Sequence, residues 1–291
     1  MMTKVVVVEI TPTDAERAQE RLAQESLTQA VVSLCEQGFV VVNDVVAHDH
    51  LNFLRERMEE DLKQLREVPE VPHNFVWGNI QQDPPPLPQY VFRDVVANPF
   101  VCQITREALG PNAFNSSLSG NTNVPGSGLQ PVHVDLGQLW PSLPFAHPAS
   151  HLVVNLALDD TTADNGAIEL WPGTHLDTRR VIGEDLRLTE KEVEERRRRV
   201  PPVLGMTRRG AFLIRDMRLW HRGRPNTTGC TRFMIAMVHK VGWFRRTSHG
   251  DLDQRCAPVF EGCPIENEIP LVEHPSDHIG RNHRYEYDGP N

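Results

Sequence analysis

The chain has 291 residues, of which 39% are hydrophobic and 24% charged, as is typical of a globular protein with a continuous core. Its formal net charge of −9 argues against general nucleic-acid binding, which requires a basic surface to neutralise phosphates. The longest apolar runs fall far short of the roughly 20 residues that span a bilayer, so we expect no membrane segment.

The N-terminal part predicts helices around one buried strand. Residues 12–37 carry apolar side chains at a spacing near 3.6 and end before Gly38, a common helix terminator. The run of residues 38–42 is apolar throughout and predicts a buried strand. Residues 48–65 and 98–109 show helical spacing again.

A proline-rich stretch over residues 68–89 follows the second long helix. Proline lacks a backbone N–H, so this stretch predicts an irregular connection rather than one helix or strand. It carries Phe75 and Trp77, and a loop with aromatic side chains is a candidate wall of a substrate pocket. An ordinary surface connection is an equally open interpretation.

From about residue 112 the pattern changes to short strands separated by turn residues, which is typical of a β-sandwich or barrel. A charged helix over residues 189–199 interrupts the strands, and we interpret it as a solvated surface helix. A phosphate-binding role for its arginines stays open as an alternative. The predicted strands are Asn115–Asn123, Gln130–Leu136, Leu152–Leu158, Ala167–Trp171, Ala211–Arg215 and Arg232–His239.

No composition shift or low-complexity linker divides the chain. We therefore predict a single domain over residues 1–291, with N-terminal helices at about 12–66 bracing a β core at about 112–245. Residues 246–291 form a C-terminal extension of unassigned role. The fold class predicted is mainly β with flanking helices.

Two histidines and one aspartate are the candidate metal ligands. His133 and Asp135 are two residues apart, so in an extended segment their side chains point to the same side. His221 is the candidate third ligand. Two imidazoles and one carboxylate are the ligand set of non-heme Fe(II) oxygenases, and they leave coordination positions open. Zinc accepts the same donors, but the helical H-E-x-x-H motif of zinc hydrolases is absent from the sequence.

An arginine strengthens this interpretation. Arg232 follows His221 by eleven residues, across a turn marked by Pro225 and Asn226, and that spacing suits a hairpin. A hairpin would place both side chains in one cavity. The planar guanidinium group grips a carboxylate through two parallel hydrogen bonds, as a dicarboxylate such as 2-oxoglutarate would require.

Four segments together resemble the phytanoyl-CoA dioxygenase family of Fe(II)- and 2-oxoglutarate-dependent oxygenases. The similarity covers roughly residues 25–245. The segments are Gly38 to Val46, Gln130 to Asp135, Asp164 to His175 (DNGAIELWPGTH), and His221 to Arg232.

This resemblance implies a double-stranded β-helix, which is a cupin-like jelly roll. It implies that His133, Asp135 and His221 bind iron and that Arg232 pairs with the C5 carboxylate of 2-oxoglutarate. Gln130 and Thr174 match polar positions that help to hold the co-substrate in similar enzymes, and His175 matches a turn position. Gln81 or Gln82 is a further candidate contact. The implied cofactors are Fe(II), 2-oxoglutarate and O2.

The reaction expected is oxidation of a small, hydrophobic organic molecule, with release of succinate and CO2. The carboxylate of Asp135 favours hydroxylation over halogenation, while desaturation, epoxidation and cyclisation stay open. A natural-product intermediate is one candidate substrate, and clustered arginines such as Arg222 and Arg224 keep an anionic substrate open. The side chains expected to wall the pocket are Phe75, Trp77, Leu136, Leu139, Trp140, Met217 and Leu219.

Two other function classes compete with this prediction. One is a non-catalytic, cupin-like module that binds a small molecule, and the other is a hydrolase or isomerase that uses a different metal. A small-molecule substrate is the only partner expected, without nucleic acid or membrane, and the sequence indicates no oligomeric state. The five cysteines lack metal-site spacing and no signal peptide is evident, so we expect a cytoplasmic location, with one disulfide left open.

Overall fold

The computed structural model describes residues 6–183, 185–244 and 249–283. The strands of these residues form one large mixed sheet, a small sheet of three strands and a separate pair of short strands. The small sheet contains β6 (Ile168–Leu170), β7 (Val203–Gly205) and β9 (His221–Gly223). The large sheet contains β1 (Glu9–Ile10), β2 (Phe39–Val42), β3 (Asn79–Gln81), β4 (Phe114–Asn123), β5 (His151–Ala157), β8 (Phe212–Asp216), β10 (Arg232–Lys240) and β12 (Glu266–Asn267).

The large sheet has the strand order β1-β2-β8-β5-β10-β4-β12, with β3 added beside β4, and the small sheet has the order β7-β6-β9. Within the run β8-β5-β10-β4, each strand is antiparallel to the next. Two facing sheets of this kind form a jelly roll, so the predicted fold class is confirmed.

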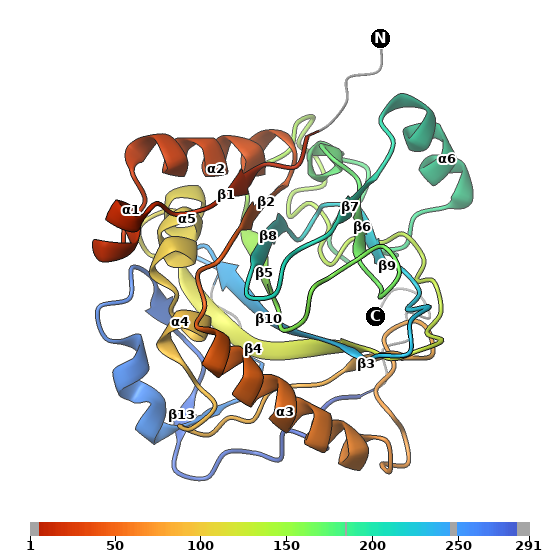
Figure 1. Cartoon of the computed structure of the whole chain (residues 1–291). Helices are drawn as coiled ribbons and strands as arrows, with labels where there is room; N and C mark the ends of the chain where they lie inside the picture. The colour runs from red at the N-terminus through yellow and green to blue at the C-terminus, as the bar shows by residue number, and fades with distance from the viewer. Residues whose placement is uncertain (1–5, 184, 245–248, 284–291) are drawn as a thin grey trace.

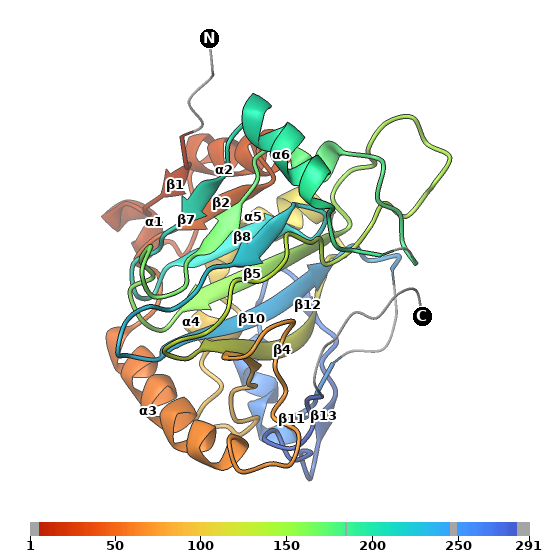
Figure 2. The same ribbon diagram turned by 90° about the vertical axis from the view of Figure 1, so that its right-hand side faces the viewer.

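Helices cover one side of the large sheet, and the small sheet lies on the other side (Figures 1 and 2). The exposed helix α6 lies beside the small sheet (Figure 2). The helices are α1 (Asp14–Ala18), α2 (Gln24–Glu36), α3 (His48–Leu65), α4 (Arg93–Val96), α5 (Pro99–Leu109) and α6 (Glu190–Arg199), with short 3-10 helices at Thr174–Leu176 and Gln254–Phe260.

Strand β10 shows how the sequence separates core from cavity. Successive side chains of a strand point to opposite faces. Phe233, Ile235 and Met237 belong to the hydrophobic core under the helices. Met234 and Ala236, which alternate with them, line a cavity between the two sheets. The same strand therefore supplies the core on one face and a binding site on the other.

Two predicted elements differ from the structure. The helix expected over residues 12–37 is two helices, because Glu20 adopts a positive φ of 47° and ends the first one. The strand expected over Gln130–Leu136 is absent, and only His133 makes an isolated bridge there. Pro131 lacks a backbone N–H, which prevents a continuous ladder at this point. The helix predicted over residues 48–65 is confirmed with the same limits.

The described part of the C-terminal extension packs against the end of the β core. Strand β12 pairs with β4, and β11 (Leu252–Asp253) pairs with β13 (Leu271–Val272). Arg281 forms an ion pair with the buried Asp83 at 2.5 Å, which ties this segment to the proline-rich loop.

Among the described residues, no helix is both long and apolar enough to cross a bilayer. The five cysteines all lie among the residues that the structure describes, and all are free thiols.

Helix α3 gives a test of the core. Leu54 is fully buried in the hydrophobic core, whereas Glu56 on the same helix is exposed. We expect Leu54→Ala to lower the free energy of unfolding by about 2–5 kcal/mol, because it removes buried methyl groups and leaves a cavity. Glu56→Ala should change it by less than about 0.5 kcal/mol. Urea unfolding of both variants measures the difference, and similar losses would contradict the assigned packing.

Candidate metal centre

The two histidines of the candidate site are fixed by backbone pairing. His221 begins β9, and His133 lies beside it in an isolated antiparallel bridge. Each residue donates its backbone N–H to the carbonyl oxygen of the other, at 3.0 Å in both directions. Asp135 is held next to them, because its backbone N–H donates to the carbonyl oxygen of Met217 at 2.9 Å.

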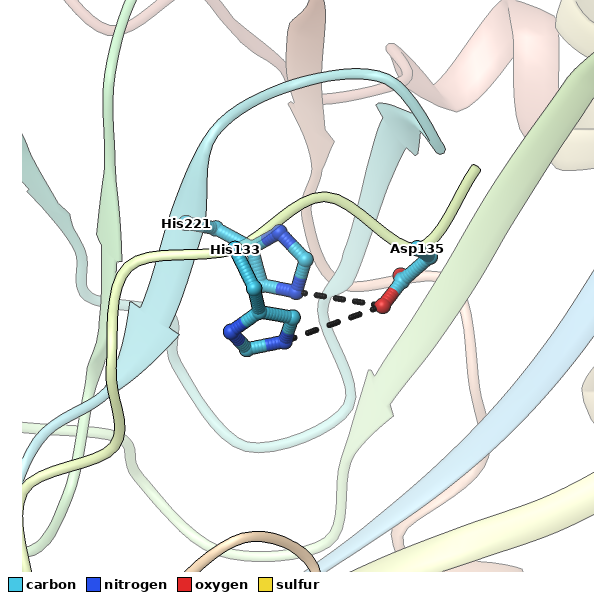
Figure 3. Close-up of side chains that lie close together, drawn as sticks. All are labelled: His133, Asp135 and His221. Atoms are coloured by element: carbon cyan, nitrogen blue, oxygen red, sulfur yellow. Dashed lines mark ion pairs between the residues drawn. The ribbon is translucent and has the colours of Figure 1, made fainter. Parts of the chain in front are cut away.

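The three side chains converge on one point (Figure 3). An oxygen of the Asp135 carboxylate lies 3.8 Å from Nε2 of His133 and 3.5 Å from Nε2 of His221. One potential ligand atom from each residue lies within 4.8 Å of the other two. The sequence-based grouping of these residues is therefore present in the structure, although they come from two separate segments.

The other nitrogen of each ring fixes its tautomer. Nδ1 of His133 lies 2.9 Å from the carbonyl oxygen of Pro131, and Nδ1 of His221 lies 2.9 Å from that of Leu219. A carbonyl oxygen only accepts hydrogen bonds, so each Nδ1 carries the proton and donates. The lone pair of each Nε2 is then free for a metal, as in many histidine-metal sites.

Protonation states also suit a metal. Burial lowers the pKa of His133 and of His221, although the charge of Asp135 opposes this, so both rings stay neutral at pH 7. Burial acts to raise the pKa of Asp135, but the charge of Arg215 and its hydrogen bond to the carboxylate act against burial, and that pKa lies below its usual range. Two neutral imidazoles and one ionised carboxylate are the donor states that Fe(II) requires.

The three side chains open into a cavity of about 360 Å3 between the two sheets. Arg232 lies in the wall of the same cavity and is buried. It donates to the carbonyl oxygen of Gly166 at 3.2 Å, and its Nε has no hydrogen-bond partner among the described residues. Burial lowers its pKa to about 10, so the group is still charged at neutral pH and is suited to bind an anion.

The two further predicted co-substrate contacts differ in position. Gln130 lines the cavity, where its Oε1 accepts from the backbone N–H of Gly223 at 2.7 Å and its Nε2 donates to the carbonyl oxygen of Asn74 at 3.0 Å. Thr174 lies outside the cavity wall. Its hydroxyl donates to the carbonyl oxygen of Trp171 at 2.7 Å and accepts from the N–H of Trp220 at 2.9 Å.

His175 and the candidate glutamines have structural contacts. His175 is buried, and its Nε2 lies 3.0 Å from the carbonyl oxygen of Cys35, as suits a turn position. Gln81 lines the cavity. Gln82 is buried, donates to the carbonyl oxygen of Met58 and accepts from the hydroxyl of Thr122.

The cavity wall is more polar than expected. Of the seven apolar residues predicted to form it, Met217 alone lines the cavity. Phe75 packs its ring 4.5 Å from that of His133, Leu219 lies in a hydrophobic cluster, and Trp77 and Trp140 are largely exposed. The wall is instead rich in amides and hydroxyls, which include Asn74, Asn79, Ser117, Ser119, Asn121 and Asn155.

Sequence reasoning also missed Arg215. It lies in β8, and its Nη2 is 2.7 Å from the second oxygen of the Asp135 carboxylate. The available signal was a charged residue that follows Phe212, Leu213 and Ile214 in a strand. An arginine placed so deep in an apolar strand requires a buried partner.

Comparisons with known proteins agree with this geometry. The structure resembles a non-heme alpha-ketoglutarate-dependent carbocyclase, SnoK, from nogalamycin biosynthesis, at 20% identity over 79% of this chain and 87% of that chain, with a TM-score of 0.54. It also resembles AviO1 from Streptomyces viridochromogenes Tue57, at 19% identity over 78% and 100%, with a TM-score of 0.57. A third similar structure is SnoN, a non-heme alpha-ketoglutarate-dependent epimerase of nogalamycin biosynthesis, at 17% identity over 75% and 84%, with a TM-score of 0.54.

These similarities support the jelly-roll fold. The family is shown by the sequence, because the model of phytanoyl-CoA dioxygenase (PhyH) matches residues 34–234, well over half of the chain. The chain belongs to the phytanoyl-CoA dioxygenase family and is a non-heme iron, 2-oxoglutarate-dependent dioxygenase.

Proposed function

We propose that this chain uses iron held by His133, Asp135 and His221 to oxidise a C–H bond of a small organic molecule. The convergence of three buried ligand atoms within 4.8 Å carries this proposal. When bound, iron and 2-oxoglutarate supply the oxidising power, with release of succinate and CO2. The protein supplies ligands of defined protonation state, a charged group for the co-substrate and a cavity that limits water.

Each ligand has a defined task. The backbone bridge between His133 and His221 sets the separation of the two imidazoles, and the Nδ1 hydrogen bonds orient both Nε2 atoms toward one point. Arg215 engages the oxygen of Asp135 that does not face the histidines, which favours coordination through the other oxygen alone. Three protein donors then leave positions for co-substrate and O2.

Arg232 is the anchor that we propose for the far carboxylate of 2-oxoglutarate. It is a buried cation in the same cavity as the metal ligands, and its Nε is unpartnered among the described residues. Gln130 lines the same cavity and holds Gly223 through its amide oxygen. Thr174 acts at a distance in this proposal, because its hydroxyl fixes the backbone of Trp220 next to His221.

The oxidation outcome follows from Asp135 and the cavity. Asp135 would supply a carboxylate to the metal where a halide would otherwise bind, so we propose hydroxylation, desaturation, epoxidation or cyclisation rather than halogenation. Two similar structures are described as a carbocyclase and an epimerase of nogalamycin biosynthesis. This supports a natural-product intermediate as the substrate. The wall also contains apolar residues such as Val153, Ile168 and Met234, so it suits a substrate with polar groups as well as the hydrophobic one that the sequence predicted.

We also propose that the whole chain acts as one catalytic domain. Strands from β1 near the N-terminus to β12 in the C-terminal extension belong to the same sheet, which supports this proposal. A cytoplasmic location stays a proposal, supported by five free thiols.

The proposed function is tested by succinate release. Purified protein supplied with Fe(II), ascorbate and 2-oxoglutarate should form succinate in air but not under nitrogen. Addition of a metabolite extract should yield a product with one added oxygen or two fewer hydrogens, detected by mass spectrometry. A hydrolase, an isomerase or a non-catalytic binding module would form no O2-dependent succinate.

Removal of one imidazole should abolish this activity. We expect His133→Ala and His221→Ala to reduce succinate formation to the level of free Fe(II), because two protein donors hold the metal weakly. His48→Ala is the matched control, since His48 lies exposed at the start of α3 and should keep full activity. Full activity in either ligand variant would contradict the assignment.

Arg232→Ala should act on the co-substrate. We expect the apparent KM for 2-oxoglutarate to rise about 10- to 100-fold, because a charge-assisted hydrogen bond to its carboxylate is lost. Arg222→Ala is the control, since Arg222 pairs with Glu169 and is not among the residues that line the cavity. Succinate formation measured against 2-oxoglutarate concentration compares them, and an unchanged KM in Arg232→Ala would disprove the anchor.

A further inference from the structure

Arg215 is a buried cation, and it is not among the residues that match the iron and co-substrate positions of the family. Its side chain is 7% exposed, and the residue is one of those that line the cavity. Nη2 is engaged with Asp135 at 2.7 Å. Nε and Nη1 have no hydrogen-bond partner among the described residues. Two unsatisfied donors on a buried charge are costly, so a bound acceptor that reaches this guanidinium group would stabilise it.

The charges around the cavity point to an anion. Four ionised side chains of the described residues line it, namely Asp83, Asp135, Arg215 and Arg232. Arg281 already pairs with Asp83 at 2.5 Å. In the loaded site, the dipositive iron and Arg232 balance Asp135 and the two carboxylates of 2-oxoglutarate. Arg215 then remains as one uncompensated positive charge.

His249 does not remove this excess. It lies on the cavity wall, and the carboxylate of Asp83 raises its pKa. Any protonation of His249 therefore adds positive charge rather than negative. A single negative charge, brought by a second molecule, would restore neutrality.

The two cavity arginines lie at separate places on the large sheet. Arg215 pairs with Val153 of β5, which pairs with Val238 of β10. Val238 is six residues from Arg232 along β10, so the two backbone positions are about 20 Å apart along the strands, at roughly 3.3 Å per residue. Arg232 thus serves one end of the cavity, and Arg215 serves the metal end.

The same cavity offers further unsatisfied polar atoms. The hydroxyl of Ser117, the amide oxygen of Asn155 and the amide nitrogen of Asn282 are buried without a hydrogen-bond partner among the described residues. All three residues line the cavity. They suit hydroxyl or amide groups on a bound molecule, and Asn282 comes from the C-terminal extension beyond the family match.

We propose that Arg215 binds a carboxylate of the organic substrate, which is therefore a small, polar monocarboxylate. The planar guanidinium group matches a carboxylate, and a phosphate monoester would bring nearly two charges where one is needed. This inference rests on the proposed function, because the charge balance assumes bound iron and 2-oxoglutarate. It makes Arg215 a specificity-determining residue at the metal end of the cavity.

Acetate and its neutral analogue acetamide are the probes. The visible charge-transfer band of the anaerobic Fe(II)–2-oxoglutarate complex is recorded while each probe is added at constant ionic strength. Acetate should shift the band with a saturable dependence, because its negative charge beside Arg215 weakens the pull of the guanidinium group on Asp135 and alters the donor strength of that carboxylate. Acetamide should leave the band unchanged.

Three variants decide whether Arg215 is responsible. Arg215→Gln should weaken acetate binding by at least about tenfold. Arg215→Lys should keep it within about tenfold of the wild type and guards against a folding defect. Arg17→Gln is the control and should behave as the wild type, since Arg17 pairs with the exposed Asp44 and is not among the residues that line the cavity.

Several results would overturn this inference. They are a wild-type band that does not respond to acetate, equal responses to acetate and acetamide, and unchanged acetate binding in Arg215→Gln. A tenfold weaker affinity of Arg215→Gln for 2-oxoglutarate, with acetate binding retained, would assign Arg215 to the co-substrate instead. Absence of the band from the wild type, before any probe is added, would reject the proposed function itself.

Discussion

The site depends on one backbone interaction, the reciprocal pair of hydrogen bonds between His133 and His221. These two residues are distant in the sequence, and the bridge places them directly opposite each other. Directly opposed residues of an antiparallel pair have side chains on the same face. Because β9 also pairs with β6, the bridge couples His133 to the small sheet. The third candidate ligand, Asp135, follows His133 by two residues, so the bridge also brings its side chain close to the two imidazoles.

The second constraint is the burial of charge. Arg215 and Asp135 form an ion pair in the cavity between the two sheets, and Arg232 lies buried in the wall of the same cavity. Buried charges persist only when they are paired or bind ions and ligands. The arrangement is therefore that of a site prepared for a metal and for anions, rather than that of a core optimised for stability. Hydrophobic packing on the opposite face of the same strands stabilises the sheet that carries these groups.

Much of this architecture is predictable from sequence, for physical reasons that differ between regions. The spacing of Leu51, Leu54 and Met58 predicts helix α3 because its apolar stripe faces the core along its length. The pair of His133 and Asp135 is predictable because side chains two residues apart point to the same side of an extended chain. His221 is predictable as their partner because two imidazoles and one carboxylate form a known iron-binding set. The interruption near Glu20 is not predictable from periodicity, since a single left-handed residue leaves the apolar pattern intact.

The cavity wall escapes sequence reasoning for a topological reason. Asn74, Ser117, Asn155 and Asn282 come from a loop, two strands and the C-terminal extension, and only the fold brings them together. Taken singly, each is an ordinary polar residue. We expected the apolar residues that neighbour the candidate ligands in sequence to line the cavity. Leu219, for example, instead packs into a hydrophobic cluster.

The central claim is that three side chains form one iron site that also accepts 2-oxoglutarate. Its most direct test is an anaerobic titration of the metal-free protein with Fe(II) in the presence of 2-oxoglutarate. The account predicts a visible charge-transfer band that reaches its end point at one iron per chain, and that is absent from His133→Ala. A folded wild-type protein that binds iron without this band, or a His133→Ala variant that shows the wild-type band, would contradict it.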